Sequence, residues 1–194
     1  MAKWFFEPGH TAAEFSVRHM MVSDVRGHFK NVHGKLTFDP EKPEGSRAEV
    51  QIDARSLWTG EPDCDAHVRS ADFLDVEHYP AITFTGDQVR VLGEHDFVLE
   101  GQLTIRGIGR DVALRVRSLG QWATPWWEEG IDKGPKTRAG FYAETEINRH
   151  DFGVNWNSVL DRGGIVVGCT VEIRIDAEAI MVDAPPDVHS HSCA

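Results

Sequence analysis

Apolar and polar residues alternate with a period of two along most of this chain, and this pattern limits the fold more than any other feature. In the longest run, Val171, Ile173 and Ile175 alternate with Glu172 and Arg174. Successive side chains of a strand point to opposite faces, so each such run predicts a strand with one apolar and one charged face. The same alternation recurs at residues 14–19, 48–55, 82–85, 97–105, 112–117 and 141–147.

One charged face per strand indicates antiparallel strands with a wetted side, because parallel strands read as continuous apolar runs. Residues 25–38 predict a bent hairpin around Gly34, a residue that often marks a bend or bulge within a strand. In total we expect about eight strands, enough to close into a barrel whose interior is either filled by side chains or open to a small ligand. The pattern alone leaves both interiors possible.

The segment from Thr59 to Thr85 predicts a helix, a connector and a strand. Pro62 suits the first turn of a helix, and Asp63 and Asp65 place negative charge near its N-terminus. Pro80 then biases Tyr79 away from helical geometry, and an alternating strand follows.

This segment resembles a signature of the YceI-like family of lipid- and polyisoprenoid-binding proteins, at Thr59, Gly60, Asp65, His67, Phe73, Tyr79, Pro80 and Phe84. Three further blocks match the family in its order: HTAAEFSVRHMMVSDVRGHF from His10, LTIRGIGRDVAL from Leu103, and AGFYAETEINRHDFGVNW from Ala139. The resemblance covers roughly residues 3–180. Two features depart from it: Cys64 stands where a basic residue is expected, and the tail after Ala184 has no family counterpart.

The resemblance implies an all-β fold: a single eight-stranded antiparallel, lipocalin-like barrel with one or two short helices. We expect residues 1–182 to form this barrel and residues 183–194 to form a C-terminal tail. The family's barrels enclose long isoprenoid or acyl chains, so the ligand expected here is a polyisoprenoid, an isoprenoid quinone or a fatty-acyl lipid. Burial of each CH₂ contributes about 0.8 kcal/mol, so a long chain needs few polar contacts.

Candidate lining residues are chosen for their position in the pattern, mostly within the matching blocks, with ordinary core packing as the alternative for each. They are Phe15, Val17, Phe29, Ile52, Leu57, Phe84, Leu103, Phe141, Ile147 and Phe152. Polar candidates for holding a head group are His19, Asp65, His67, Asn148 and Arg149. Asn148 and Arg149 equally suit a turn stabilised by side-chain bonds to the backbone. Asp65 and His67 equally suit capping the short helix.

Composition excludes several classes of function. A net charge of −11 argues against nucleic-acid binding and against electrostatic attraction to anionic lipid. No run approaches the roughly 20 apolar residues of a membrane span, so stable membrane insertion is not expected. Three widely separated cysteines favour reduced thiols, and no leader-type segment follows Met1. We therefore expect a cytoplasmic protein without a cofactor, although many relatives are exported.

An enzyme is the alternative class. The chain has no nucleophile elbow, P-loop or dinucleotide-binding motif, which favours binding without catalysis. The competing interpretation is a metal-dependent or hydrolytic site built from His and Asp at the barrel mouth. His189, His191 and Cys193 in the tail carry metal-ligand side chains, but structural zinc usually takes four ligands from ordered positions.

Half of the tryptophans lie in a predicted loop from Gly120 to Lys136, namely Trp122, Trp126 and Trp127. This loop suits a lid over the barrel, a contact with a membrane interface, or packing against the outer wall or a partner subunit. We favour the last interpretation, since isolated surface tryptophans reduce solubility. A homodimer is therefore one expected partner state, besides the lipid itself.

Overall fold

The computed structural model describes residues 1–182 of the chain. The predicted tail at 183–194, with His189, His191 and Cys193, lies outside the described residues. The strands are β1 (Ala2–Phe6), β2 (Ala12–His19), β3 (Ser23–Phe29), β4 (Val32–Phe38), β5 (Arg47–Asp53), β6 (Leu57–Trp58), β7 (Ala81–Val91), β8 (Asp96–Ile105), β9 (Ile108–Glu128), β10 (Ile131–Asn148) and β11 (Val167–Met181). The helices are α1 (Pro62–Arg69) and the 3₁₀ turns η1 (Pro8–His10), η2 (Pro43–Gly45), η3 (Ala54–Ser56), η4 (Arg149–Phe152) and η5 (Asp161–Gly163).

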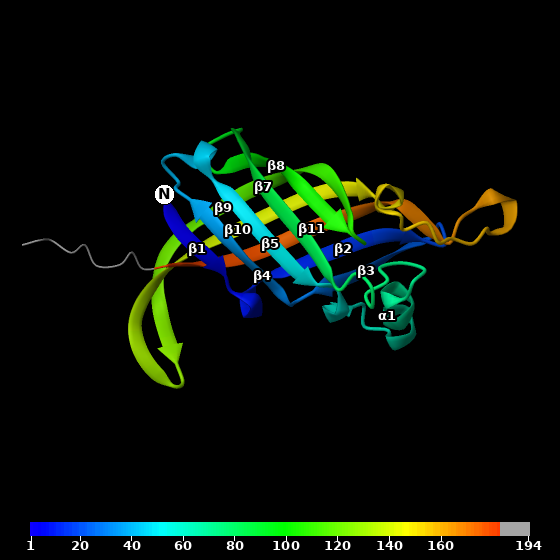
Figure 1. Ribbon diagram of the computed structural model, residues 1–194, viewed down its shortest axis with the longest axis horizontal. Helices are drawn as coiled ribbons and strands as arrows, with labels where there is room; N and C mark the ends of the chain where they lie inside the picture. Colours follow the sequence, from blue (N-terminus) through cyan, green and yellow to red (C-terminus); the bar gives the residue numbers. More distant parts are fainter. Residues whose placement is uncertain (183–194) are drawn as a thin grey trace, which may run out of the picture.

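The strands form one antiparallel sheet that closes into a barrel (Figure 1). Closure occurs at β1, which pairs with β4 on one side and with β11 on the other. β1 and β2 lie along the same edge of β11, separated by η1, while β3 and β4 form the second arm of the same hairpin. β1 and β2 together occupy one strand position of the barrel, and β3 and β4 together occupy the next. With the six long strands β5 and β7–β11, the barrel has eight strand positions, as predicted.

The bend of this hairpin was predicted at Gly34, and that position is wrong. Pairing of β4 with β5 runs without a shift through Gly34 and Val50, and the break lies at residues 30–31, between β3 and β4. Gly34 has a different role, because a Cβ there would lie 2.3 Å from the carbonyl oxygen of Glu49. It permits close approach of two strands.

The predicted loop from Gly120 to Lys136 is also wrong, because β9 and β10 continue through it as a two-stranded ribbon. β8 pairs with β9 only as far as Arg117, and β11 pairs with β10 only as far as Arg138. Beyond these residues no described strand pairs with the ribbon, so within residues 1–182 its edges are free. Pro125 and Pro135 stand opposite each other in the ribbon. Proline has no backbone N–H, and it is tolerated here because at these two positions the N–H would point to a free edge.

The ribbon contacts the barrel wall through Arg138. Its Nε lies 2.5 Å from a carboxylate oxygen of Glu178 on β11 and 3.5 Å from one of Glu7. The ring of Trp126 stacks on the Arg138 guanidinium, which lies 5.4 Å from its centroid. This geometry favours packing against the wall for Trp126, whereas Trp122 is 78% exposed and its contact with a partner or membrane stays a prediction.

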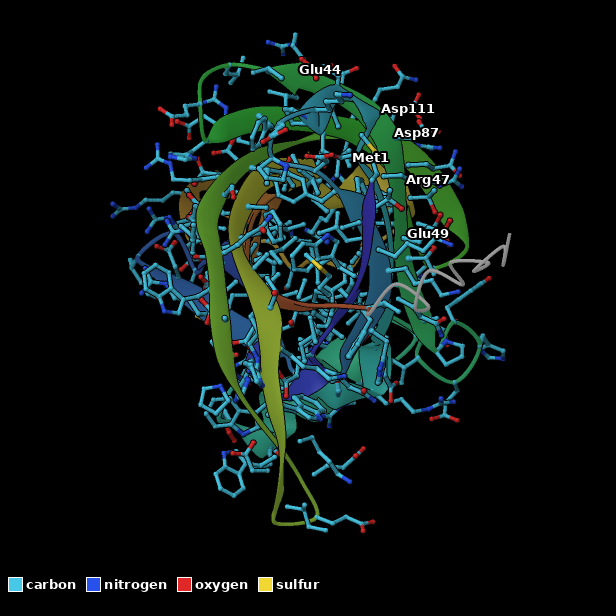
Figure 2. All side chains as sticks on the ribbon, turned by 90° about the vertical axis from the view of Figure 1, so that its left-hand side faces the viewer. Met1, Glu44, Arg47, Glu49, Asp87 and Asp111 are labelled. Carbon is cyan, nitrogen blue, oxygen red and sulfur yellow. The ribbon has the colours of Figure 1, made fainter. Side chains whose placement is uncertain are left out.

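The two ends of the barrel differ. One end, called the α1 end, carries α1, η4 and the connection to β11, and the other, the ribbon end, carries the β9–β10 ribbon (Figure 1). Figure 2 looks into the ribbon end and shows the strands as a ring, with Glu49, Asp87 and Asp111 on its outside. Among the described residues, α1 is the single α-helix and is far too short to cross a bilayer.

Candidate ligand-binding cavity

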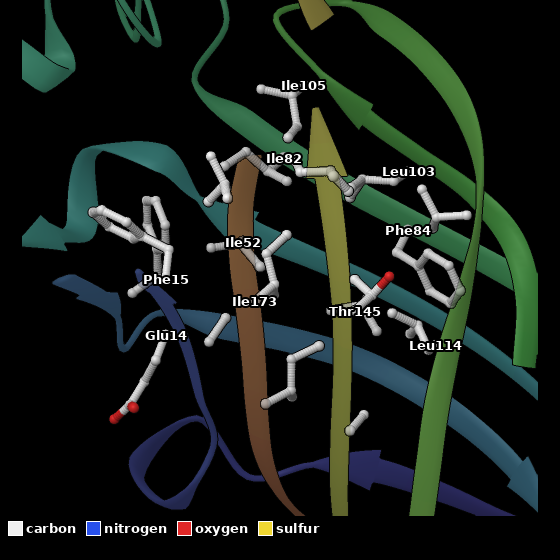
Figure 3. A pocket seen from close by; sticks show the side chains of 18 of the residues that line it. Glu14, Phe15, Ile52, Ile82, Phe84, Leu103, Ile105, Leu114, Thr145 and Ile173 are labelled. Atoms are coloured by element: carbon white, nitrogen blue, oxygen red, sulfur yellow. The ribbon is translucent and has the colours of Figure 1, made fainter. Parts of the chain in front are cut away.

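A cavity of about 380 Å³ occupies the barrel interior. Its wall follows the inward face of every long strand; on β11 the wall is formed by residues from Val167 to Ala177. Ten residues of strand at about 3.3 Å each, tilted by about 40°, span about 25 Å along the barrel axis. The cavity is therefore elongated, and its wall is almost entirely apolar (Figure 3).

Partly buried apolar residues show that the interior is open rather than filled. Ile173 and Ile175 lie on the inward face of β11, yet both retain accessible surface. Val116 on β9 and Ile147 on β10 do the same. Because these side chains point into a closed barrel, their accessible surface faces the cavity.

All of the predicted site residues except Asn148 and Asp65 lie on the cavity wall. They are Phe15, Val17, His19, Phe29, Ile52, Leu57, His67, Phe84, Leu103, Phe141, Ile147, Arg149 and Phe152. This placement is a structural finding, and their contact with a ligand stays a prediction.

Asn148 lies outside the cavity wall, so the structure favours its turn role over the predicted ligand contact. Its side chain is exposed at the N-cap of η4, where the carboxamide oxygen accepts a hydrogen bond from the His150 N–H at 3.0 Å. Asn is favoured at such caps because its side chain satisfies a free backbone N–H.

Asp65 and His67 both belong to α1, but their side chains have different structural roles. Asp65 is 6% exposed and accepts hydrogen bonds from the Thr59 backbone N–H at 2.7 Å and from the Thr59 hydroxyl at 2.6 Å. It thus connects the helix to the preceding segment. His67 reaches the cavity wall, with Nε2 3.0 Å from a carboxylate oxygen of Asp72.

Arg149 is 4% exposed and has no carboxylate partner within the part of the chain that the structure describes. Its guanidinium donates to four backbone carbonyls, those of Val154, Trp156, Val167 and Gly168, at 2.7–3.2 Å. Burial lowers the pKa of this guanidinium, because desolvation disfavours the charged form. Arg149 therefore holds the connection between η4 and β11 in place.

Aromatic side chains line the cavity at its α1 end. The His67 ring meets Trp156 and Phe73 edge-on, with centroids 4.6 Å and 5.0 Å away. Arg106 joins the two segments, since it donates to the carbonyls of Phe73 at 2.9 Å and Gly153 at 3.2 Å. Sequence reasoning missed Trp156 as a wall residue, because the irregular segment around it has no periodic pattern.

Away from the α1 end, the residues of the wall include a few with hydroxyl groups and the charged residues Glu14 and Arg47. Thr145 on β10 lies among Ile173 and Leu114 (Figure 3). Ser46, beside η2 at the ribbon end, is buried, and within residues 1–182 its Oγ has no hydrogen-bond partner. A buried hydroxyl can rotate to meet a polar group, so the wall has limited means to hold a polar end of a ligand.

The candidate metal and hydrolytic sites can be compared with this geometry. Among the described residues, one group of at least three His, Cys, Asp or Glu side chains has its potential metal-ligand atoms within 4.8 Å of one another. It consists of Glu7, His10 and Glu178. They lie at the outer wall, away from the cavity, where Arg138 already pairs with both carboxylates. No described Ser, Thr or Cys side chain hydrogen-bonds to the ring of His67. The predicted alternative at the barrel mouth gains no support from this geometry.

Comparison with known proteins identifies the family of this chain. The family model of the YceI-like domain matches residues 4–179. The chain belongs to the YceI-like family. A UPF0312 protein of Pseudomonas putida strain W619 is 32% identical over 174 residues, which cover 90% of this chain and 83% of that protein. Protein YceI of Escherichia coli O17:K52:H18 is 36% identical over 148 residues, 76% of this chain and 73% of that protein.

Solved structures share this YceI-like fold. BcnA of Burkholderia cenocepacia superposes with a TM-score of 0.75 at 22% identity, covering 89% of this chain and 98% of that one. A polyisoprenoid-binding domain from Saccharophagus degradans superposes with a TM-score of 0.64 at 15% identity, covering 94% and 100%. At such identities the likeness concerns the fold alone.

Proposed function

We propose that this YceI-like protein binds, stores or transports one long-chain amphiphile in its barrel cavity without chemical turnover. The observation that carries the proposal is the elongated apolar cavity inside a closed barrel. Each methylene group moved from water into such a cavity contributes about 0.8 kcal/mol, so affinity grows with chain length.

The ligand class follows from the shape and chemistry of the wall. A cavity about 25 Å long with few polar groups suits a single long chain better than a compact polar molecule. Candidates are a polyisoprenoid, an isoprenoid quinone or a fatty-acyl lipid. The polyisoprenoid-binding domain from Saccharophagus degradans, which has the same fold, supports this class.

Binding without catalysis agrees with the polar groups of the cavity wall. The guanidinium of Arg149 donates to backbone carbonyls, and the ring of His67 hydrogen-bonds to Asp72 and to no described Ser, Thr or Cys side chain. The expected lack of a cofactor and the cytoplasmic location stay predictions.

Native mass spectrometry of untagged protein purified without detergent tests the proposal. We expect a stoichiometric adduct whose extracted mass matches an isoprenoid, a quinone or a fatty-acyl compound. A bare protein mass that also fails to increase after incubation with added isoprenoids or fatty acids would contradict the proposal.

A further inference from the structure

The turn between β2 and β3 carries residues that its backbone geometry disfavours. The Val22 N–H donates to the His19 carbonyl at 3.2 Å, and the two residues between them, Met20 and Met21, have φ values of 46° and 64°. Left-handed φ at both central positions is the pattern of a type I′ turn, which favours Asn and Gly. Bulky side chains at these positions strain the backbone. Methionine at both therefore calls for an explanation beyond turn formation.

The same turn exposes its apolar side chains. Met20 is 47%, Met21 56% and Val22 82% exposed, and Val159 in the connection between η4 and β11 is 79% exposed. We call these four residues the methionine tip.

The two segments of the methionine tip lie together at the α1 end (Figure 1). The Met20 N–H donates to the Val166 carbonyl at 2.7 Å, and a Cβ built on Gly164 would lie 3.3 Å from Cγ of Met21. The apolar surface of Met20, Met21 and Val22 therefore lies against the connection that carries Val159.

This surface is continuous with the cavity. His19, which precedes the turn, and Val166, which binds its backbone, both line the cavity wall. The apolar path along β2 runs from Phe15 and Val17 inside the barrel to Met20 and Met21 outside it. A chain that leaves the cavity here would meet apolar side chains instead of water.

We propose that the methionine tip inserts into the surface of a lipid bilayer and that the ligand enters and leaves the cavity beside it. This inference rests on the proposed function, because only a lipid-binding protein needs such a path. A long apolar chain is costly to expose to water, so its natural source and destination is a bilayer. Methionine suits the contact because its flexible side chain adapts to irregular apolar surroundings.

Positive and negative side chains both surround the methionine tip. Electrostatic attraction to lipid head groups of a single charge is therefore not expected. Arg18 pairs with Asp24 at 3.4 Å, and Asp161 and Arg162 are exposed side by side in η5. The whole chain carries a net charge of −11. Docking should therefore occur on zwitterionic phosphatidylcholine vesicles and should change little with ionic strength, since it depends on apolar contact.

The double substitution Met20→Asn with Met21→Gly gives a sharp test, because it removes the apolar side chains and supplies the residues that the turn prefers. Its thermal midpoint should rise, so any loss of function cannot be due to unfolding. Leu92→Asn is the matched control: Leu92 is 55% exposed in the β7–β8 connection at the ribbon end, far from the tip.

The protein is loaded with a pyrene-labelled long-chain fatty acid, and its transfer to phosphatidylcholine vesicles is followed by fluorescence. For the wild type and Leu92→Asn, the transfer rate should rise in proportion to vesicle concentration, as collisional transfer requires. The double variant should retain the probe but transfer it at least about tenfold more slowly, because two side chains no longer enter the bilayer.

Two results would overturn the inference and leave the proposed function intact. One is a double variant that holds the probe and transfers it at the wild-type rate. The other is that the wild type is a dimer, and that the double substitution makes it a monomer without slowing transfer. The tip would then be a contact between two copies of the chain. Failure of the wild type itself to hold any probe would instead contradict the proposed function together with this inference.

Discussion

Phe84 on β7 and Leu103 on β8 stand directly opposite each other in the antiparallel register, and both side chains line the cavity (Figure 3). Such a pair normally packs against a filled core in a small barrel. Here, instead, the space in front of it is open, and this difference separates a ligand-binding barrel from a merely structural one.

Leu103→Trp should abolish ligand retention and leave the fold intact, because the larger ring enters open space. If the core were filled, the same change would cost about 1–3 kcal/mol or more through overpacking. Circular dichroism and native mass spectrometry check the two outcomes together. Glu100→Trp, at an exposed position on the same strand, is the control and should retain ligand. An unfolded Leu103→Trp variant would contradict the open cavity.

Arg149→Met should lower the free energy of unfolding by about 3–5 kcal/mol, because four buried or partly buried carbonyls lose their donor. Lysine should recover only part of this loss, since one ammonium cannot reproduce the planar set of donors. Urea denaturation measures both variants. Arg110→Met is the control. Among the described residues, the exposed Arg110 side chain donates only to the adjacent Gly109 carbonyl, so its loss should cost no more than about 0.5 kcal/mol. A small effect at Arg149 would show that the connection to β11 is held by other contacts.

Asp65→Ala should destabilise the protein by about 1–3 kcal/mol while ligand retention is unchanged, because the carboxylate accepts two hydrogen bonds from Thr59 and lies away from the cavity wall. Asp63→Ala in the same helical turn is the control and should stay within about 0.5 kcal/mol. Thermal denaturation and mass spectrometry give the two readouts. A folded Asp65→Ala variant that lost its ligand would revive a functional role for this carboxylate.

His78 provides a test of pH dependence. Its Nδ1 lies 2.8 Å from a carboxylate oxygen of Asp75, and this hydrogen bond raises the pKa of His78 above its ordinary value of 6.5. The folded protein thus binds the proton more tightly than the unfolded chain. The contribution of the pair is complete below pH 6.5 and disappears as the pH rises through the raised pKa.

The pKa of His78 can be followed by NMR titration, and it should fall toward 6.5 in Asp75→Asn. The difference in unfolding free energy between wild type and His78→Gln should shrink as the pH rises, and it should be absent in the Asp75→Asn background. A difference that grew with pH would contradict this assignment.

Strand periodicity identified most of the fold because it reports a local property, the orientation of successive side chains. The alternation of Val171, Ile173 and Ile175 with charged residues correctly predicted which face of β11 turns inward. Predictions failed where local composition was a poor guide to pairing. The segment with Pro125 and Pro135 suggested a loop, but proline is tolerated at the free edges of a ribbon, and edges are a property of the whole sheet.

The site residues likewise include some that strand periodicity predicts and others that it does not. Residues such as Phe84 and Leu103 were identified as inward-facing from the pattern, whereas Trp156 lies in an irregular segment where only the folded chain shows what it contacts. Asn148 and Arg149 are neighbours in the sequence, yet one is an exposed cap and the other is buried beneath four carbonyls. The 3₁₀ turn at η4 interrupts the two-residue alternation, so strand parity no longer predicts direction there.

By itself the sequence determined the all-β class, the inward face of each main strand and the family, because alternation and ordered motifs are carried by residues close together in the chain. Only the tertiary structure decided that the interior is open, that Met20 and Met21 stand beside its α1 end, and that β9 and β10 extend past their neighbours. These features depend on distances between strands far apart in sequence, and the volume inside a barrel depends on how all of its walls pack at once.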